Sequence, residues 1–322
     1  HVSSGSLFPH PRNPAGDPPV PIGGIQTPPS AEGGALRSQD LRTEGDPVGL
    51  NGTVIRIDPA TGAALPDNPL FSHGDPNARR IVAYGLRNPF RMAMRPGTPD
   101  LWVGDVGWRD WEEIVRVPDP AAGVVRNFGW PCYDGPSRTA YDAADLKICE
   151  DLYAEPGAVT SAHYQYREGV PITSGEPCEF TDSSLSGLAF YESGSYPEQY
   201  NGALFFADYT RGCIWVMPPG PDGVPDPARR ATFVGRAAFP VDLKTGPGGD
   251  LYYVDIVGGT VRRIRFGSAS SPRAAITADR TSGPAPLTVN FNGSGSTDPE
   301  GSALMYSWDL DGNGTFDDSA AA

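Results

Sequence analysis

The 322-residue chain has little positive charge, no long apolar run and few cysteines. Its 25 lysines and arginines face 39 aspartates and glutamates, which gives a net charge of −14. Such a surface repels nucleic acid and anionic membranes, and no basic cluster offsets it. No apolar run approaches the roughly 18 residues that a membrane helix needs. We therefore expect no nucleic-acid partner and no membrane insertion, whereas a neutral sugar suits this charge.

The four cysteines lack the Cys-x-x-Cys spacing of a metal site, and four cysteines allow three disulfide pairings. We favour Cys132–Cys149 and Cys178–Cys213. Four free thiols are the alternative, and they suit a loop-rich, exported chain less well. Because the chain begins at His1 without a signal peptide, we expect a processed protein or a fragment. We expect it to be secreted, extracellular or on the cell surface, in a bacterium.

Turn-forming residues are abundant. The chain has 40 glycines and 35 prolines, almost twice their usual combined share of about 12%. Short strand-like runs broken by glycine and proline turns fill the stretch from Ile81 to Pro131. Together with 10% aromatic residues, this pattern predicts a folded all-β protein whose polar residues gather at the sheet rim.

An aromatic strand pattern that ends in aspartate occurs three times. The second and third copies are about 47 residues apart, close to the ~40–50 residues of a four-stranded propeller blade. We therefore predict equivalent strands in separate blades, with about three to four blades in the chain. Chance similarity among aromatic strands is the alternative. The copies are Leu101–Asp105, Leu204–Asp208 and Leu251–Asp255.

Four ordered motifs resemble the soluble pyrroloquinoline-quinone (PQQ)-dependent glucose/sorbosone dehydrogenase family, from roughly Gly33 to Phe266. The non-enzymatic Hedgehog-interacting-protein-like propellers share this pattern. The resemblance implies a six-bladed propeller, here partial, over residues 1–266 with its N-terminal blades missing. The motifs are Gly85–Pro89, Leu101–Gly107, Glu112–Ile114 and Asn127–Pro131.

By resemblance, the intact enzyme would oxidise an aldose at its anomeric carbon. A histidine base would take the hydroxyl proton as hydride passes to PQQ bound over Ca²⁺, and an external acceptor would then take the electrons. The family's base is expected upstream of His1, so no catalytic residue is assigned here. A non-catalytic carbohydrate- or protein-binding propeller is the rival, and a structural surface-array protein is a weaker third.

The Arg-Asn pair of the first motif is the candidate cofactor contact. In the family that Arg87 and Asn88 resemble, this pair touches the quinone. A fixed guanidinium stabilises the negative charge that hydride transfer builds on a quinone oxygen. The alternative is that the pair only caps a blade.

Gly107, Trp108 and Glu112 are the candidate Ca²⁺ ligands by the same resemblance, through two backbone carbonyls and one acid. The family commonly has proline where Trp108 stands, and a tight turn with solvated acids is the alternative. Two further positions depart from the enzymes. The stretch Thr210-Arg211-Gly212 stands where some relatives place a lysine, and no basic pair precedes the strand from Pro240 to Asp242.

The composition changes after Phe266. Residues 267–273 read as a linker, and residues 274–322 resemble the start of an immunoglobulin-like PKD domain, a module of secreted enzymes and surface proteins. Such a module adds a surface polysaccharide to the expected partners. A final acidic loop resembles the start of a Ca²⁺-binding loop, although Ala320 stands at the twelfth position, where such loops have a bidentate glutamate. A polar turn without metal is the alternative. The loop residues are Asp309, Asp311, Asn313 and Asp317.

Overall fold

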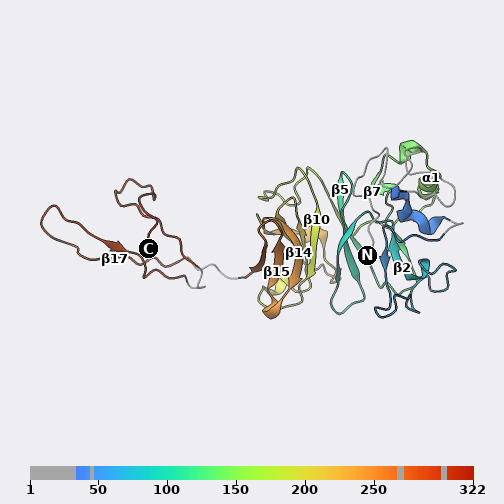
Figure 1. The fold of residues 1–322 in the computed structure, drawn as a ribbon, viewed down its shortest axis with the longest axis horizontal. Helices are drawn as coiled ribbons and strands as arrows, with labels where there is room; N and C mark the ends of the chain where they lie inside the picture. Colours follow the sequence, from blue (N-terminus) through green and yellow to red (C-terminus); the bar gives the residue numbers. More distant parts are fainter. Residues whose placement is uncertain (1–33, 44–46, 267–271, 299–302) are drawn as a thin grey trace. The chain divides into compact units, whose positions relative to one another are not determined.

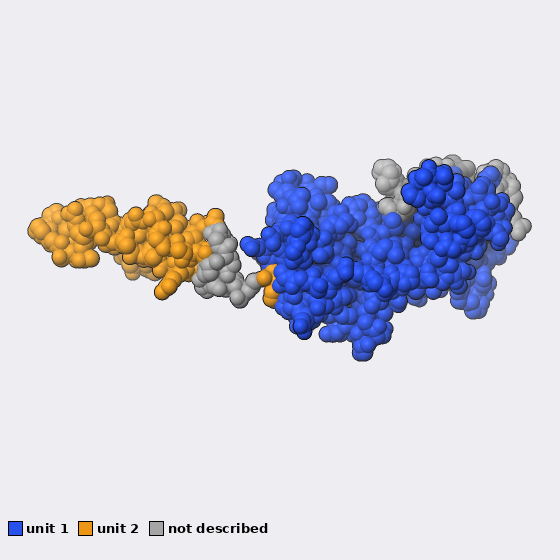
Figure 2. All heavy atoms as spheres, turned by 90° about the horizontal axis from the view of Figure 1, so that it is seen from below, with its two compact units in different colours: residues 1–265 blue, residues 266–322 orange. Residues whose placement is uncertain are grey.

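The computed structural model describes residues 34–43, 47–266, 272–298 and 303–322. The chain divides into two compact units, His1–Arg265 and Phe266–Ala322, which Figure 2 colours separately. No helix in the described ranges is long and apolar enough to cross a membrane. The one α-helix of the described residues, α1, spans Lys147–Ala154.

Unit 1 is built from antiparallel sheets that stand side by side (Figure 1). The first sheet contains β3 (Pro89–Met94), β4 (Leu101–Asp105), β5 (Trp111–Val117) and β9 (Tyr164–Arg167). The second contains β10 (Leu185–Phe190), β11 (Leu204–Asp208), β12 (Cys213–Met217) and β13 (Ala231–Val234). The third contains β14 (Pro240–Thr245), β15 (Leu251–Asp255) and β16 (Thr260–Ile264).

Smaller elements complete unit 1. In a further sheet, β2 (Ile81–Tyr84) lies between β1 (Val54–Ile55) and the parallel β6 (Arg126–Asn127). A short ribbon pairs β7 (Tyr133–Asp134) with β8 (Ser137–Arg138). The remaining helical turns are η1 (Gly34–Arg42), η2 (Ala78–Arg80), η3 (Asp142–Ala144), η4 (Glu198–Tyr200), η5 (Pro227–Arg229) and η6 (Pro247–Gly249).

The three repeated strands occupy equivalent positions, as the sequence predicted. Each is the second strand of its own sheet, and a register irregularity follows the first residue of each preceding strand. Each terminal aspartate accepts a backbone hydrogen bond from the residue just before the first strand of its sheet. The pairs are Asn88 with Asp105, Ser184 with Asp208, and Phe239 with Asp255.

The core lies between the sheets, because the middle sheet is covered on both faces. Adjacent residues of β11 point to opposite sides: Phe206 packs with Trp102 and Trp215 toward the first sheet, and Phe205 packs with Leu251 toward the third. Every residue of β11 and β12 is buried. A strand buried on both faces reads as a continuous apolar run, which is why alternation is weak in the sequence here.

Both predicted disulfides are confirmed. Cys132 and Cys149 have Cα atoms 5.3 Å apart, and Cys178 and Cys213 have Cα atoms 5.8 Å apart. The first ties the start of the β7–β8 ribbon to α1. The second ties the loop before β10 to β12, because Cys213 is the first residue of that strand. All four cysteines are therefore in disulfide bonds, and the alternative of free thiols is wrong.

Unit 2 has little regular structure among its described residues. It contains the antiparallel pair β17 (Thr277–Ala278) and β18 (Phe291–Asn292), with isolated bridges from Arg273 to Thr297 and from Trp308 to Ser319. A PKD sandwich is not evident in these elements, so that identity stays a prediction. Most of the predicted linker lies outside the described residues.

Candidate functional site

A sharp turn between β2 and β3 carries the predicted cofactor motif. Gly85 opens it with a φ of 72°, in the left-handed region that glycine adopts at low cost. A Cβ on Gly85 would lie 2.1 Å from Asn127 Oδ1, so the chain passes too closely here for a side chain. Asn127 is itself fixed by paired amide hydrogen bonds with Gln39 of 2.8 and 2.9 Å. The turn is therefore rigid, and it presents Arg87 and Asn88 at the sheet rim.

Asp105 at the end of β4 holds this turn. Its carboxylate accepts the backbone amide of Arg87 at 2.9 Å and that of Asn88 at 2.6 Å. Burial raises the pKa of Asp105 to about 7, against the lowering effect of these two hydrogen bonds. The aspartate that ends the repeated strand pattern therefore positions the Arg-Asn pair directly.

The Arg87 side chain joins the cofactor motif to the predicted Ca²⁺ turn. Its Nη1 donates to the carbonyl oxygens of Val106 at 2.9 Å and Gly107 at 2.6 Å. Its guanidinium carbon lies 5.8 Å from the ring centroid of Trp130, whose edge meets Trp108. The guanidinium is half-buried and fixed, so its charge is preorganised and partly shielded from water.

Gly107, Trp108 and Glu112 line one small cavity of about 40 Å³. Burial raises the pKa of Glu112, with a further contribution from nearby Asp208, and one carboxylate oxygen accepts the Leu185 amide at 2.9 Å. A Cβ on Gly107 would lie 1.5 Å from the carbonyl oxygen of Trp111. The structure thus brings the three predicted ligands together, with Glu112 also bonded to the neighbouring sheet.

Asp134 is a site residue that the sequence analysis missed. Its carboxylate accepts the backbone amides of Trp108 at 3.1 Å, Arg109 at 3.3 Å and Asp110 at 3.3 Å. It lies in β7, just after Cys132, so the disulfide-bonded segment supports the Gly107 turn. The sequence around Asp134 contains no motif that indicates this long-range contact.

We expect Asp134→Ala to destabilise unit 1 by about 1–3 kcal/mol, because it leaves three backbone amides without their acceptor. Urea unfolding followed by tryptophan fluorescence measures the effect. Asp110→Ala is the matched control, since Asp110 is exposed and pairs with exposed Arg167; we expect a change within about 0.5 kcal/mol. Equal effects of the two substitutions would contradict this role for Asp134.

Arg211 does not present its charge to a ligand. Its buried guanidinium donates to the carbonyls of Arg167 at 2.7 Å and Val170 at 2.8 Å, and to Ser183 Oγ at 2.9 Å. It also lies over the ring of Tyr166. Within the stretch Thr210-Arg211-Gly212, the arginine is therefore a structural cation.

In the acidic loop of unit 2, only some of the predicted Ca²⁺ ligands lie together. Carboxylate oxygens of Asp309 and Asp311 lie within 4.8 Å of one another and of Asp318, which the sequence analysis did not select. Asp317 is not a member of this cluster, while Asn313 donates its side-chain amide to Asp311.

The described histidines, His73 and His163, lie outside the candidate site. His163 contacts the Pro225 carbonyl through Nε2 at 2.7 Å, and its ring packs on Trp102 at 4.5 Å. His73 accepts the amide of Asp75 through Nδ1 in an exposed turn. His1 and His10 lie outside the described residues.

Comparison with known proteins assigns the chain to a family. The model of the glucose/sorbosone dehydrogenase family matches residues 35–254, so the chain belongs to that family. It is 30% identical over 203 residues to the aldose sugar dehydrogenase YliI of Escherichia coli strain K12, covering 63% of this chain and 47% of that protein. It is 26% identical over 160 residues to the HIPL2 protein of Arabidopsis thaliana, covering 49% and 21%.

Solved structures agree on the fold. A crystal structure of a glucose dehydrogenase matches with a TM-score of 0.52 at 21% identity, covering 72% of this chain and 58% of that one. At this identity the match supports the all-β, multi-sheet architecture alone. The chain spans less than half the length of either curated relative.

Proposed function

We propose that this chain is part of a secreted, PQQ-dependent aldose dehydrogenase, and that Arg87 and Asn88 contact the quinone. The observation that carries the proposal is the bond from Arg87 to the Gly107 carbonyl, which joins the predicted cofactor motif to the predicted Ca²⁺ turn. The family membership supports the sugar dehydrogenase class. The substrate would be an aldose oxidised at its anomeric carbon, and an external acceptor would take the electrons.

The donor set around the small cavity suits Ca²⁺. The carbonyls of Gly107 and Trp108 and the carboxylate of Glu112 are hard oxygen ligands of the kind this ion prefers. Burial raises the pKa values of Asp105 and Asp134 near this turn, so a divalent cation would favour their ionised forms. The Ca²⁺ would thereby balance the buried carboxylates that surround Arg87.

Bound PQQ would supply the hydride-accepting carbonyl. Arg87 would stabilise the negative charge that develops on the quinone oxygen, because its guanidinium is already oriented by two carbonyls. The Trp130 ring lies beside Arg87 and contacts Trp108 edge to face. The proton of the sugar hydroxyl needs a base, and the family resemblance implies a histidine for that role.

A non-catalytic carbohydrate- or protein-binding propeller is the second candidate. The burial of Arg211 favours it, because that cation is engaged by backbone carbonyls and does not face a ligand. Trp108 in place of the usual proline favours it too. For unit 2, we propose a PKD-type module that contacts a surface polysaccharide, with an exposed Ca²⁺ site at Asp309, Asp311 and Asn313.

Isothermal titration of the chain with PQQ in the presence of Ca²⁺ tests the proposal. We expect saturable binding that weakens by at least about tenfold in Arg87→Ala, because a charge-assisted contact is worth ~1.5–3 kcal/mol. Arg91→Ala is the control, since Arg91 pairs with Asp242 at a half-exposed position in β3. Absence of PQQ binding, or equal weakening in both variants, would instead support the non-catalytic alternative.

A further inference from the structure

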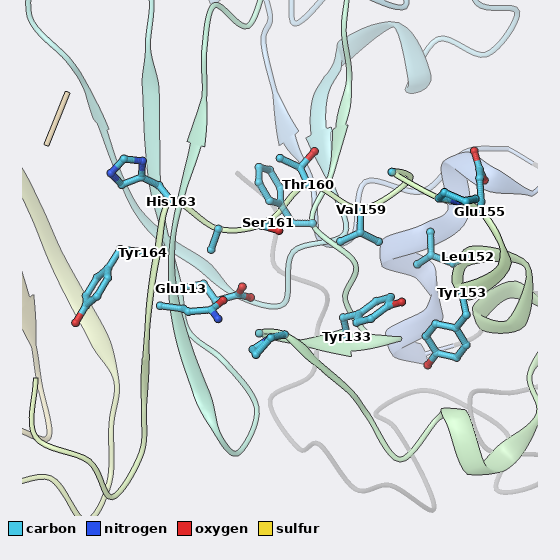
Figure 3. A pocket seen from close by; sticks show the side chains of 17 residues that line it. Glu113, Tyr133, Leu152, Tyr153, Glu155, Val159, Thr160, Ser161, His163 and Tyr164 are labelled. Carbon is cyan, nitrogen blue, oxygen red and sulfur yellow. The ribbon is translucent and has the colours of Figure 1, made fainter. Parts of the chain in front are cut away.

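Unit 1 contains a second, much larger cavity of about 690 Å³ between the first sheet and the disulfide-bonded segment (Figure 3). Its volume falls in the range of small-molecule sites, about 300–1,000 Å³. Its lining shares no residue with the small cavity beside Glu112, and it does not include Arg87. The two cavities are therefore separate candidate sites.

Strand alternation in β5 separates them. Glu112 bonds to Leu185 of the neighbouring sheet, whereas Glu113 points to the opposite face and into the large cavity (Figure 3). Glu113 is the cross-strand partner of Gln165 in β9, and both residues line the cavity. The backbone amide of Gly135 donates to the Glu113 carboxyl. One wall therefore carries a carboxyl and an amide side by side.

The other wall is aromatic and fixed in place. Tyr133 and Tyr153 meet edge to face with ring centroids 5.2 Å apart, across the cavity from Glu113 (Figure 3). Tyr153 donates its hydroxyl to the Cys132 carbonyl at 2.9 Å, and the guanidinium of Arg138 lies 4.0 Å from its ring centroid. With Cys132 in a disulfide, these rings need little rearrangement to receive a ligand.

Several polar groups of the lining are available to a ligand. The side chains of Thr160, Ser161 and Gln165 form no hydrogen bond within the described part of the chain. Glu155, by contrast, pairs with Arg42 at 3.0 Å. A ligand could therefore contact the hydroxyls of Thr160 and Ser161, the amide of Gln165 and the carboxyl of Glu113. These groups face the tyrosine rings of the other wall. Among the described residues, no lysine or arginine lines this cavity.

We propose that this cavity binds a neutral carbohydrate, one to two sugar units in size. A sugar ring has an apolar C–H face that can pack on tyrosine rings and a rim of hydroxyls that can pair with Gln165, Glu113 and the two hydroxyl side chains. The site lies apart from the Arg87 turn and needs no cofactor. It would hold a carbohydrate during turnover or anchor the protein on one, and it goes beyond the proposed function.

Isothermal titration of the intact chain, without PQQ, tests the inference with maltose, cellobiose and N-acetylglucosamine as probes. We expect at least one to bind saturably and to bind about tenfold more weakly to Gln165→Leu, which keeps the volume and removes the amide. Tyr133→Ala should weaken binding by about the same factor, and Tyr133→Phe should bind nearly as well as the native chain. Circular dichroism confirms that each variant is folded.

Arg87→Ala separates this inference from the proposed function, because it should leave sugar binding unchanged while weakening PQQ binding. Failure of all three sugars to bind would overturn the inference. So would sugar binding that survives Gln165→Leu but is lost in Arg87→Ala, since it would place the sugar at the cofactor turn. Binding of spermidine in preference to the sugars, lost in Glu113→Gln, would also overturn it, because it would identify a cation site.

Discussion

Replacing Arg211 with methionine should destabilise unit 1 by about 3–5 kcal/mol, the range seen when one partner of a buried charged network is removed. Arg211 is fully buried, and its side chain satisfies two carbonyls and one hydroxyl. It also neutralises Glu176 and Asp208, each 4.0 Å away. Methionine fills similar space but leaves those three acceptors without their donor. Both carboxylates keep their other hydrogen bonds and lose the buried positive charge nearby.

Denaturant unfolding of the native chain and the variant measures this effect. Arg211→Lys should also lose at least about 1–3 kcal/mol, because a single ammonium cannot reproduce the fork of three donors. Arg265→Met is the matched control, since Arg265 is exposed at the end of unit 1, and we expect less than about 0.5 kcal/mol. An Arg211→Met variant as stable as the control would show that the network contributes nothing.

Gly107→Ala should be the most damaging small substitution at the rim. The added Cβ would lie 1.5 Å from the Trp111 carbonyl oxygen and 2.7 Å from its carbon, and both are backbone atoms. The turn must open to relieve this overlap, which also displaces the carbonyl that Arg87 contacts. We expect a loss of about 3 kcal/mol or more in unfolding free energy, together with loss of PQQ binding.

Gly74→Ala is the control for this substitution. No atom lies within 4 Å of the position where its Cβ would stand, and its φ is outside the left-handed region. It should be neutral or slightly stabilising, because alanine restricts the unfolded chain more than glycine does. If Gly107→Ala folds with native stability and still binds PQQ, the close packing of this turn has no functional consequence.

The fold was largely predictable because its signals are local. The strand ending in Asp105 and its two later copies predicted the separate sheets. In the structure, each of the three aspartates accepts a backbone amide just before the first strand of its own sheet. The two disulfide pairs favoured among the three possible pairings also proved correct. These features depend on neighbours within one sheet or one loop, so a single sequence contains them.

The site was predictable only where a family motif exists. Arg87, Gly107 and Glu112 were selected by resemblance, and the structure brings them to one rim. Asp134 was missed because its three bonds cross from β7 to a turn more than twenty residues away. The prediction of Asp317 in the acidic cluster of unit 2 was wrong for a similar reason. The fold of the loop decides which of two neighbouring carboxylates joins the cluster, and here it is Asp318.

We propose above that Arg87, Asn88 and the Gly107 turn hold a quinone over Ca²⁺. A crystal structure of the chain grown with PQQ and Ca²⁺ tests it most directly. We expect quinone density in contact with the Arg87 guanidinium, and a calcium ion bound by the carbonyls of Gly107 and Trp108 and the carboxylate of Glu112. Quinone bound elsewhere on the chain, or a Gly107 turn that binds neither ligand at saturating concentrations, would contradict it.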